Sequence, residues 1–192
     1  MFINMGKDYS LRKDDFLYAL GMTEEFKDNP LPQSIYLARV PITRYQLDGK
    51  EIDPVIDYDA YRYFAGWKSD GSLKWSKYET DAIALEGLSA LSQSAVMYHP
   101  GTDRYIFFAG FAGNATGTEA GLEGVTDMIP VGAIYEARYP WGPWHKVGII
   151  PAGFIAGLIT KGTGPDFFYF TAAGGGPVTY NLNVGKIVLD LY

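Results

Sequence analysis

The stretch Asp103–Gly110 (DRYIFFAG) decides the fold class, because it has the form of a short buried strand entered through a tight turn. A turn-favouring aspartate comes first, an aromatic-rich apolar run follows, and a glycine ends it. The same form recurs at Asp15–Gly21 (DFLYALG) and at Asp166–Gly174 (DFFYFTAAG). Three copies of one strand pattern predict an all-β protein built from repeated units.

A second strand pattern follows each copy of the first. Ser34–Val40 (SIYLARV) matches Ala133–Tyr139 (AIYEARY), and Asn183–Val188 (NVGKIV) is a weaker third copy. The shared core is Ile-Tyr-x-Ala-Arg. We therefore expect Tyr36 and Tyr135 to occupy equivalent positions in successive units.

A third element with tryptophan ends two of the units, at Trp75 and at Trp144, which are also expected to be equivalent. Repeats of about 40–50 residues made of short strands are typical of β-propeller blades. The sequence therefore predicts one domain over residues 1–192, a partial β-propeller of about three antiparallel blades. The expected blades are residues 1–80, 88–148 and 152–192.

Turn signals separate the strands. Asp70-Gly71 predicts a hairpin before the strand that bears Trp75, and Pro100-Gly101 predicts another after Val96–His99. The polar stretch 46–59 and the Gly-rich stretch 110–124 are expected as long loops. Helical periodicity is scarce, which favours a structure that is almost entirely antiparallel β.

Composition narrows the classes of function. The chain has 192 residues with 47% hydrophobic and 16% aromatic residues, so it can bury a substantial core. Its formal net charge of -6 argues against nucleic-acid binding, because phosphate contacts need Lys and Arg. The absence of cysteine excludes disulfides, thiolate metal sites and a cysteine nucleophile.

The cellular location has one weak signal. The triplet Asn114-Ala115-Thr116 fits the glycosylation acceptor pattern, and we expect an extracellular protein. Met1–Ser10 lacks the basic start and apolar run of a signal peptide, and no stretch reaches the length of a membrane span. Because the chain begins in what resembles a strand, further sequence is expected upstream.

Six motifs together carry a family resemblance. In chain order they are Ile35–Val40 (IYLARV), Tyr61–Gly66 (YRYFAG), Trp75-Ser76, Tyr135–Arg138 (YEAR), Trp141–Trp144 (WGPW) and Tyr180–Val184 (YNLNV). Over nearly its whole length the chain resembles a domain-of-unknown-function family of five-bladed β-propellers that includes glycoside hydrolases acting on D-arabinan. The resemblance implies a carbohydrate-active propeller that cleaves arabinofuranose polymers with a carboxylate pair. It extends to the last two to three blades only, so the missing blades are expected upstream or on another chain.

Candidate catalytic residues follow from the positions of the inner strands. Glycoside hydrolysis usually needs two carboxyl groups that flank the bond. In a propeller, ligands meet the innermost strand of each blade, expected here at 3–9, 93–99 and 155–161. Asp8, beside Lys7, ends the first of these strands, and Glu86 precedes the second. We therefore assign Asp8 and Glu86 as candidate catalytic carboxylates and Lys7 as a substrate-binding residue.

Four further residues are candidates for sugar binding. Gln93, Ser94 and His99 lie along the second inner strand, where polar groups would face a water-filled channel. Trp141 offers a flat apolar surface on which a sugar ring can stack. Asp8, Gln93 and His99 are expected to approach one cleft. Asp15, Asp103 and Asp166 recur at the same place in each unit, which indicates turn formation instead of catalysis.

No cofactor or metal is expected. His99 and His145 have no acidic partner at zinc-ligand spacing, and the glycines at 174–176 lack nucleotide-binding spacing. A noncatalytic sugar-binding or interaction module and an inactive truncated paralogue remain as alternatives to an enzyme. The expected partners are a polysaccharide or oligosaccharide, without nucleic acid or membrane. Self-association through open blade edges is expected as well.

Overall fold

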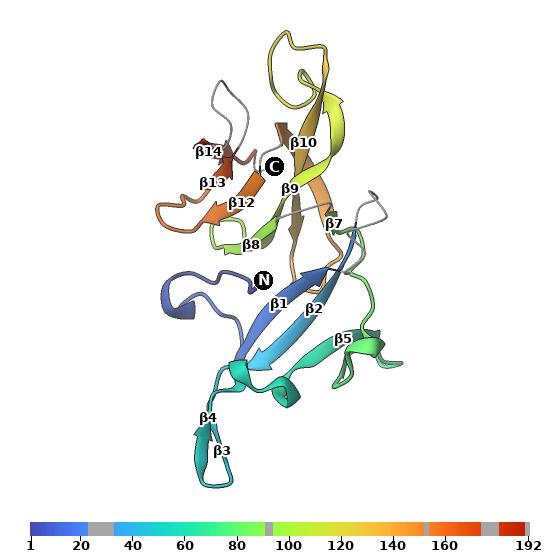
Figure 1. Ribbon diagram of the computed structural model, residues 1–192, viewed down its shortest axis with the longest axis vertical. Helices are drawn as coiled ribbons and strands as arrows, with labels where there is room; N and C mark the ends of the chain where they lie inside the picture. The colour runs from blue at the N-terminus through green and yellow to red at the C-terminus, as the bar shows by residue number, and fades with distance from the viewer. Residues whose placement is uncertain (23–32, 91–93, 152–153, 174–180, 191–192) are drawn as a thin grey trace.

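A computed structural model describes residues 1–22, 33–90, 94–151, 154–173 and 181–190 of the chain (Figure 1). Antiparallel sheets make up nearly all of its regular structure. The helical elements of these residues are three-residue 3-10 turns: η1 (Lys7–Tyr9), η2 (Pro54–Ile56), η3 (Tyr58–Ala60) and η4 (Glu79–Asp81). The prediction of an all-β protein is therefore confirmed.

The first sheet is built around a long hairpin. Its strands are β1 (Phe16–Met22), β2 (Gln33–Pro41), β5 (Arg62–Trp67) and β6 (Leu73–Ser76), in that spatial order, and β7 (Ser89–Ala90) pairs with the start of β2. Ala19, Ala38 and Tyr63 lie side by side in register across three of these strands. A separate hairpin, β3 (Tyr45–Leu47) and β4 (Lys50–Ile52), projects beyond the sheet (Figure 1).

The second and third sheets are simple meanders, in which consecutive strands pair. The second comprises β8 (Ser94–His99), β9 (Arg104–Thr116), β10 (Met128–Ala137) and β11 (His145–Pro151). The third comprises β12 (Phe154–Ile159), β13 (Phe167–Ala173) and β14 (Leu182–Val188). This blade-like architecture leaves every sheet open, because none closes on itself.

The three sheets are stacked in series, with the second in the middle (Figure 1). Phe107 of β9 is fully buried in the core that joins the first and second sheets, together with Leu37 and Tyr135. Its neighbour Phe108 points to the other side and packs with Phe168 in the core that joins the second and third sheets. The two faces of β9 thus serve two separate cores.

The N-terminal residues connect the first two sheets. Phe2 forms an antiparallel bridge to Ala19 of β1, and Asn4 forms a parallel bridge to Met97 of β8. The prediction of an inner strand at 3–9 is therefore wrong, because isolated bridges at Phe2 and Asn4 take the place of a strand. The backbone turns at η1, where Asp8 and Tyr9 adopt positive φ angles of 54° and 56°.

Two predicted hairpins are present, and both predicted long loops are partly replaced by strands. The stretch 46–59 contains most of the β3–β4 hairpin, followed by the turns η2 and η3. Asp70-Gly71 joins β5 to β6, and Pro100-Gly101 joins β8 to β9. The stretch 110–124 was expected as a loop because of its glycines. Instead β9 continues to Thr116, which pairs with Met128, and the resulting long hairpin projects from the second sheet (Figure 1). Glycine lowers strand propensity, and the β9–β10 ladder has a register shift between Val131 and Ala133. The pairing resumes at Gly113 and satisfies the backbone from there to Thr116.

The expected equivalence holds in part for the tyrosines and is wrong for the tryptophans. We call the side of a sheet that is turned toward earlier sheets in the stack its preceding side, and the opposite side its following side. Tyr36 and Tyr135 both lie on the preceding side of their sheet. Their registers against β1 and β9 differ by two residues. Trp75 lies within β6, which pairs with β5. Trp144 comes just before β11, which pairs directly with the strand of Tyr135. The extra strand in the first unit breaks the correspondence.

Candidate functional site

A cleft of about 310 Å³ collects aromatic and charged side chains from three turns and from the strand residues beside them. We call it the aromatic cleft. Its lining comes from the turn before β1, the β8–β9 hairpin and the turn after β10: Lys13, Asp14, Tyr18, Tyr98, Asp103, Tyr105, Arg138, Tyr139, Pro140 and Trp141. The cleft therefore combines groups from the first and second sheets.

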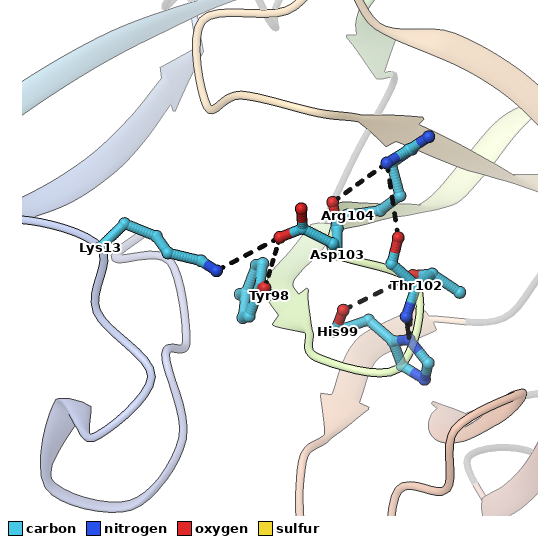
Figure 2. A network of polar contacts seen from close by, with 6 residues as sticks. All are labelled: Lys13, Tyr98, His99, Thr102, Asp103 and Arg104. Atoms are coloured by element: carbon cyan, nitrogen blue, oxygen red, sulfur yellow. Dashed lines mark hydrogen bonds and ion pairs between the residues drawn. The ribbon is translucent and has the colours of Figure 1, made fainter.

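Asp103 is the centre of the polar network in the cleft (Figure 2). The Tyr98 hydroxyl donates to its Oδ1 at 2.7 Å, and Lys13 Nζ lies 3.2 Å from the same oxygen. The ammonium group of Lys13 also stands 4.6 Å above the ring of Tyr98. The turn that presents Asp103 requires a positive φ of 53°, which aspartate tolerates better than most residues.

This network fixes the charge of Asp103. The hydrogen bond from Tyr98, followed by the bond and charge of Lys13, lowers the pKa of the Asp103 carboxyl below its usual value. The contact of Lys13 with Tyr98, followed by its contact with Asp103, raises the pKa of Lys13. Asp103 is therefore an ionised acceptor at neutral pH, held in place by two donors.

The pKa of Asp103 gives a pH prediction. Because the folded-state pKa is lowered, the contribution of this carboxylate to stability is present above its ordinary pKa of 3.8 and is lost as pH falls through the lower folded value. Asp103→Asn should therefore reduce the loss of stability as the pH falls below about 4. Urea unfolding of both proteins across this range measures it, and parallel pH profiles would contradict the assignment.

A second carboxylate is anchored on the other side of the cleft. Asp14 accepts a 2.6 Å hydrogen bond from the hydroxyl of Tyr18 and a 3.0 Å bond from the backbone N–H of Phe16. Burial and, secondarily, the Asp14 bond raise the pKa of Tyr18, so its hydroxyl stays a donor. Both carboxylates of the cleft are thus oriented by a tyrosine that belongs to the lining.

An aromatic stack forms the rim of the cleft. The rings of Tyr139 and Trp141 lie parallel within 3°, with centroids 5.2 Å apart, and Tyr18 contacts the same tryptophan at 6.4 Å. Tyr139 is 47% exposed, so the stack presents a flat apolar surface to solvent. The guanidinium of Arg138 lies 5.9 Å from the Tyr139 ring and adds a hydrogen-bond donor at the rim.

Of the predicted site residues that the structure describes, Trp141 alone lines this cleft. Lys7 and Asp8 are exposed on η1 and are not part of the lining. Glu86 is exposed too, and its carbonyl oxygen accepts a 3.0 Å bond from the backbone of Trp144. The structure therefore does not place Asp8 and Glu86 as a facing carboxylate pair in this cleft.

His99 has a structural position instead of the predicted ligand-binding one. It is fully buried, with Nδ1 3.0 Å from Thr102 Oγ1 and Nε2 3.1 Å from the carbonyl oxygen of Phe167 (the Thr102 contact is drawn in Figure 2). This histidine therefore joins the second sheet to the third, while Asp8 is exposed on η1. Gln93 lies outside the described residues. Ser94 begins β8 and is half-buried.

Most of the residues that line the cleft were not predicted as site residues from the sequence. Asp103 was assigned to turn formation because it recurs with Asp15 and Asp166, and the turn role is correct but incomplete. Lys13, its ion-pair partner, is 90 positions away in the chain. The repeat could have pointed to two of the lining residues, because Arg138 and Tyr139 directly follow the Ile-Tyr-x-Ala element that the two units share.

Comparison of the sequence with protein-family models and with curated proteins gives no match. Among the residues that the structure describes, no three His, Cys, Asp or Glu side chains gather as a metal site requires. No helix in this part of the chain is long and apolar enough to cross a bilayer.

Proposed function

We propose that the aromatic cleft binds a saccharide and that the chain is a noncatalytic sugar-binding segment of a β-propeller. The observation that carries the proposal is the Tyr139–Trp141 stack beside two carboxylates fixed by tyrosine hydroxyls. Sugar rings have an apolar face that packs on aromatic rings and hydroxyl groups that donate to carboxylates. The resemblance to arabinan-degrading proteins suggests an arabinofuranose polymer as the ligand.

The size and charges of the cleft suit a neutral, hydroxyl-rich ligand. Its volume of about 310 Å³ is at the lower end for small-molecule sites, which is enough for one or two sugar rings. Asp14 and Asp103 offer acceptors, while Lys13 and Arg138 offer donors. Charges of both signs within one cleft disfavour a strongly anionic or cationic ligand.

Hydrolysis is the second candidate, and Asp103 does not fit the acid that it requires. A glycosidase needs one carboxyl group with a raised pKa that protonates the leaving oxygen. The contacts of Asp103 lower its pKa instead. We therefore expect no release of reducing ends from D-arabinan or L-arabinan, and turnover at an ordinary enzymatic rate would sink the noncatalytic proposal.

The propeller assignment rests on the order of the sheets. Three antiparallel meanders follow each other along the chain and pack face to face in the same order. This arrangement supports three blades at about residues 1–80, 88–148 and 152–192, with β7 (Ser89–Ala90) paired to the first of them. An extracellular location would follow from a polysaccharide ligand and stays a prediction.

Binding is tested by calorimetry with arabino-oligosaccharides. Trp141→Ala and Asp103→Asn should each weaken the affinity about tenfold or more, because about 1–2 kcal/mol is expected from the stack or from a charge-assisted hydrogen bond. Trp67→Ala is the matched control, since Trp67 is 55% exposed and does not line the cleft. Equal losses in the control and the cleft variants, or no binding by the unaltered chain, would refute the proposal.

A further inference from the structure

The outer side of the third sheet carries an exposed apolar ridge. Phe167 and Tyr169 of β13 lie beside Val188 and Lys186 of β14, and Thr171 lies beside Val184. The exposed fractions of the aliphatic side chains on this side are high: 64% for Leu182, 62% for Val184 and 65% for Val188. We call Phe167, Tyr169, Leu182, Val184 and Val188 the third-sheet ridge. A group of large apolar side chains this exposed marks an interaction surface.

The outer side of the first sheet is hollow. A trough of about 720 Å³ has a floor of small residues, Ala19, Gly21 and Ala38. Tyr36 and Tyr63 rise from the same side of the sheet, and Glu79 lies at the rim. We call this the first-sheet trough. It belongs to a different face from the aromatic cleft.

The two interfaces inside the chain show what each open side accepts. Between the second and third sheets, Phe108 and Ile134 from the following side of one sheet pack on Phe168 from the preceding side of the next. Between the first and second sheets, Leu37 packs against Tyr135 in the same sense. In both interfaces, the following side of one sheet packs on the preceding side of the next sheet.

Within the part of the chain that the structure describes, the ridge and the trough are the two sides of this series that no other sheet covers. The ridge is the following side of the last sheet, and the trough is the preceding side of the first. Tyr36 stands in the trough at the motif position at which Tyr135 is buried against a neighbouring sheet. The Ile-Tyr-x-Ala-Arg motif thus places Tyr36 on the open side of the first sheet, whereas its counterpart Tyr135 packs on another sheet.

We infer that the third-sheet ridge of one molecule packs into the first-sheet trough of a second copy, head to tail. Large side chains on the ridge match a floor of alanine and glycine, as close packing requires. The charges are also complementary, because Lys186 lies on the ridge side of β14 and Glu79 lies at the rim of the trough. A contact between two different faces closes into a ring or continues as a chain of molecules.

Sedimentation velocity over a range of concentrations tests this inference, with two variants that block one face each. Val184→Asp charges the ridge, and Ala38→Arg fills the trough. Each variant alone should be monomeric, because every head-to-tail contact needs both faces. An equimolar mixture should form a dimer, since it contains one intact ridge and one intact trough. Val147→Asp, at a 50% exposed position on β11, should associate like the unaltered chain.

A milder pair of substitutions covers the case in which a blocking variant fails to fold. Lys186→Glu should weaken association about tenfold, and adding Glu79→Lys to the same chain should restore it, because the charges are exchanged. A monomeric unaltered chain at every concentration overturns the inference. So does self-association of either blocked variant, or a mixture that stays monomeric. None of these outcomes depends on whether the aromatic cleft binds a saccharide.

Discussion

Replacing Phe107 with alanine should lower the free energy of unfolding by about 3–5 kcal/mol, as expected for a large aromatic ring removed from a packed core. Phe107 is fully buried, and its ring makes edge contacts with Tyr135 and Trp144, each with a centroid distance of 6.1 Å. The core that it occupies joins the first sheet to the second. Urea unfolding followed by circular dichroism measures the effect.

Phe108→Ala should destabilise the chain by a similar amount through the other core. Its ring packs on Phe170 at 5.5 Å, between the second and third sheets. The two variants differ in where the structure loosens. Amide hydrogen exchange should rise most in β1 and β2 for Phe107→Ala, and most in β13 and β14 for Phe108→Ala.

Phe2→Ala is the surface control, because this phenylalanine is 42% exposed and its loss should cost less than half as much. If Phe107→Ala and Phe108→Ala loosened the same strands, the sheets would not be stacked in series. If neither variant lost more stability than the control, the two cores would be assigned wrongly.

The run of apolar residues in β9 explains why the fold class was predictable. Tyr105, Ile106, Phe107, Phe108 and Ala109 are all buried, so the strand has no polar face. A strand covered on both sides needs such a continuous run, and it can be seen without any structure. The hairpins at Asp70-Gly71 and Pro100-Gly101 were predictable for a local reason as well, since turn geometry depends on adjacent residues.

The candidate site was much less predictable, because contacts between distant segments decide it. Asp103 meets Lys13 across 90 positions of the chain, and His99 meets the carbonyl of Phe167 across 68. No periodicity records either contact. A polar residue at a strand end, such as His99, can face solvent or a neighbouring sheet. Only the packing of the third sheet on the second determines which.

Glu86 was predicted as a catalytic residue because of its carboxyl group. In the structure its backbone and the following glycine make the important contacts, both with Trp144. The Glu86 carbonyl accepts the Trp144 N–H, and this brings the two segments into close contact. Gly87 has a φ of +76°, and a Cβ there would overlap the carbonyl oxygen of Trp144. Trp144 is itself 2% exposed in the core between the first two sheets, so it has little room to move.

Gly87→Ala should therefore lower the free energy of unfolding by about 2–5 kcal/mol. Left-handed backbone costs a non-glycine residue about 1–2 kcal/mol, and the overlap with Trp144 adds a packing cost of about 1–3 kcal/mol. Gly49→Ala is the matched control, because its φ is +74° and its Cβ would meet nothing within 4 Å. The control should lose only the backbone part, about 1–2 kcal/mol. Thermal and urea unfolding of both variants measure the difference, and equal losses would mean that Trp144 does not pack against Gly87 as described.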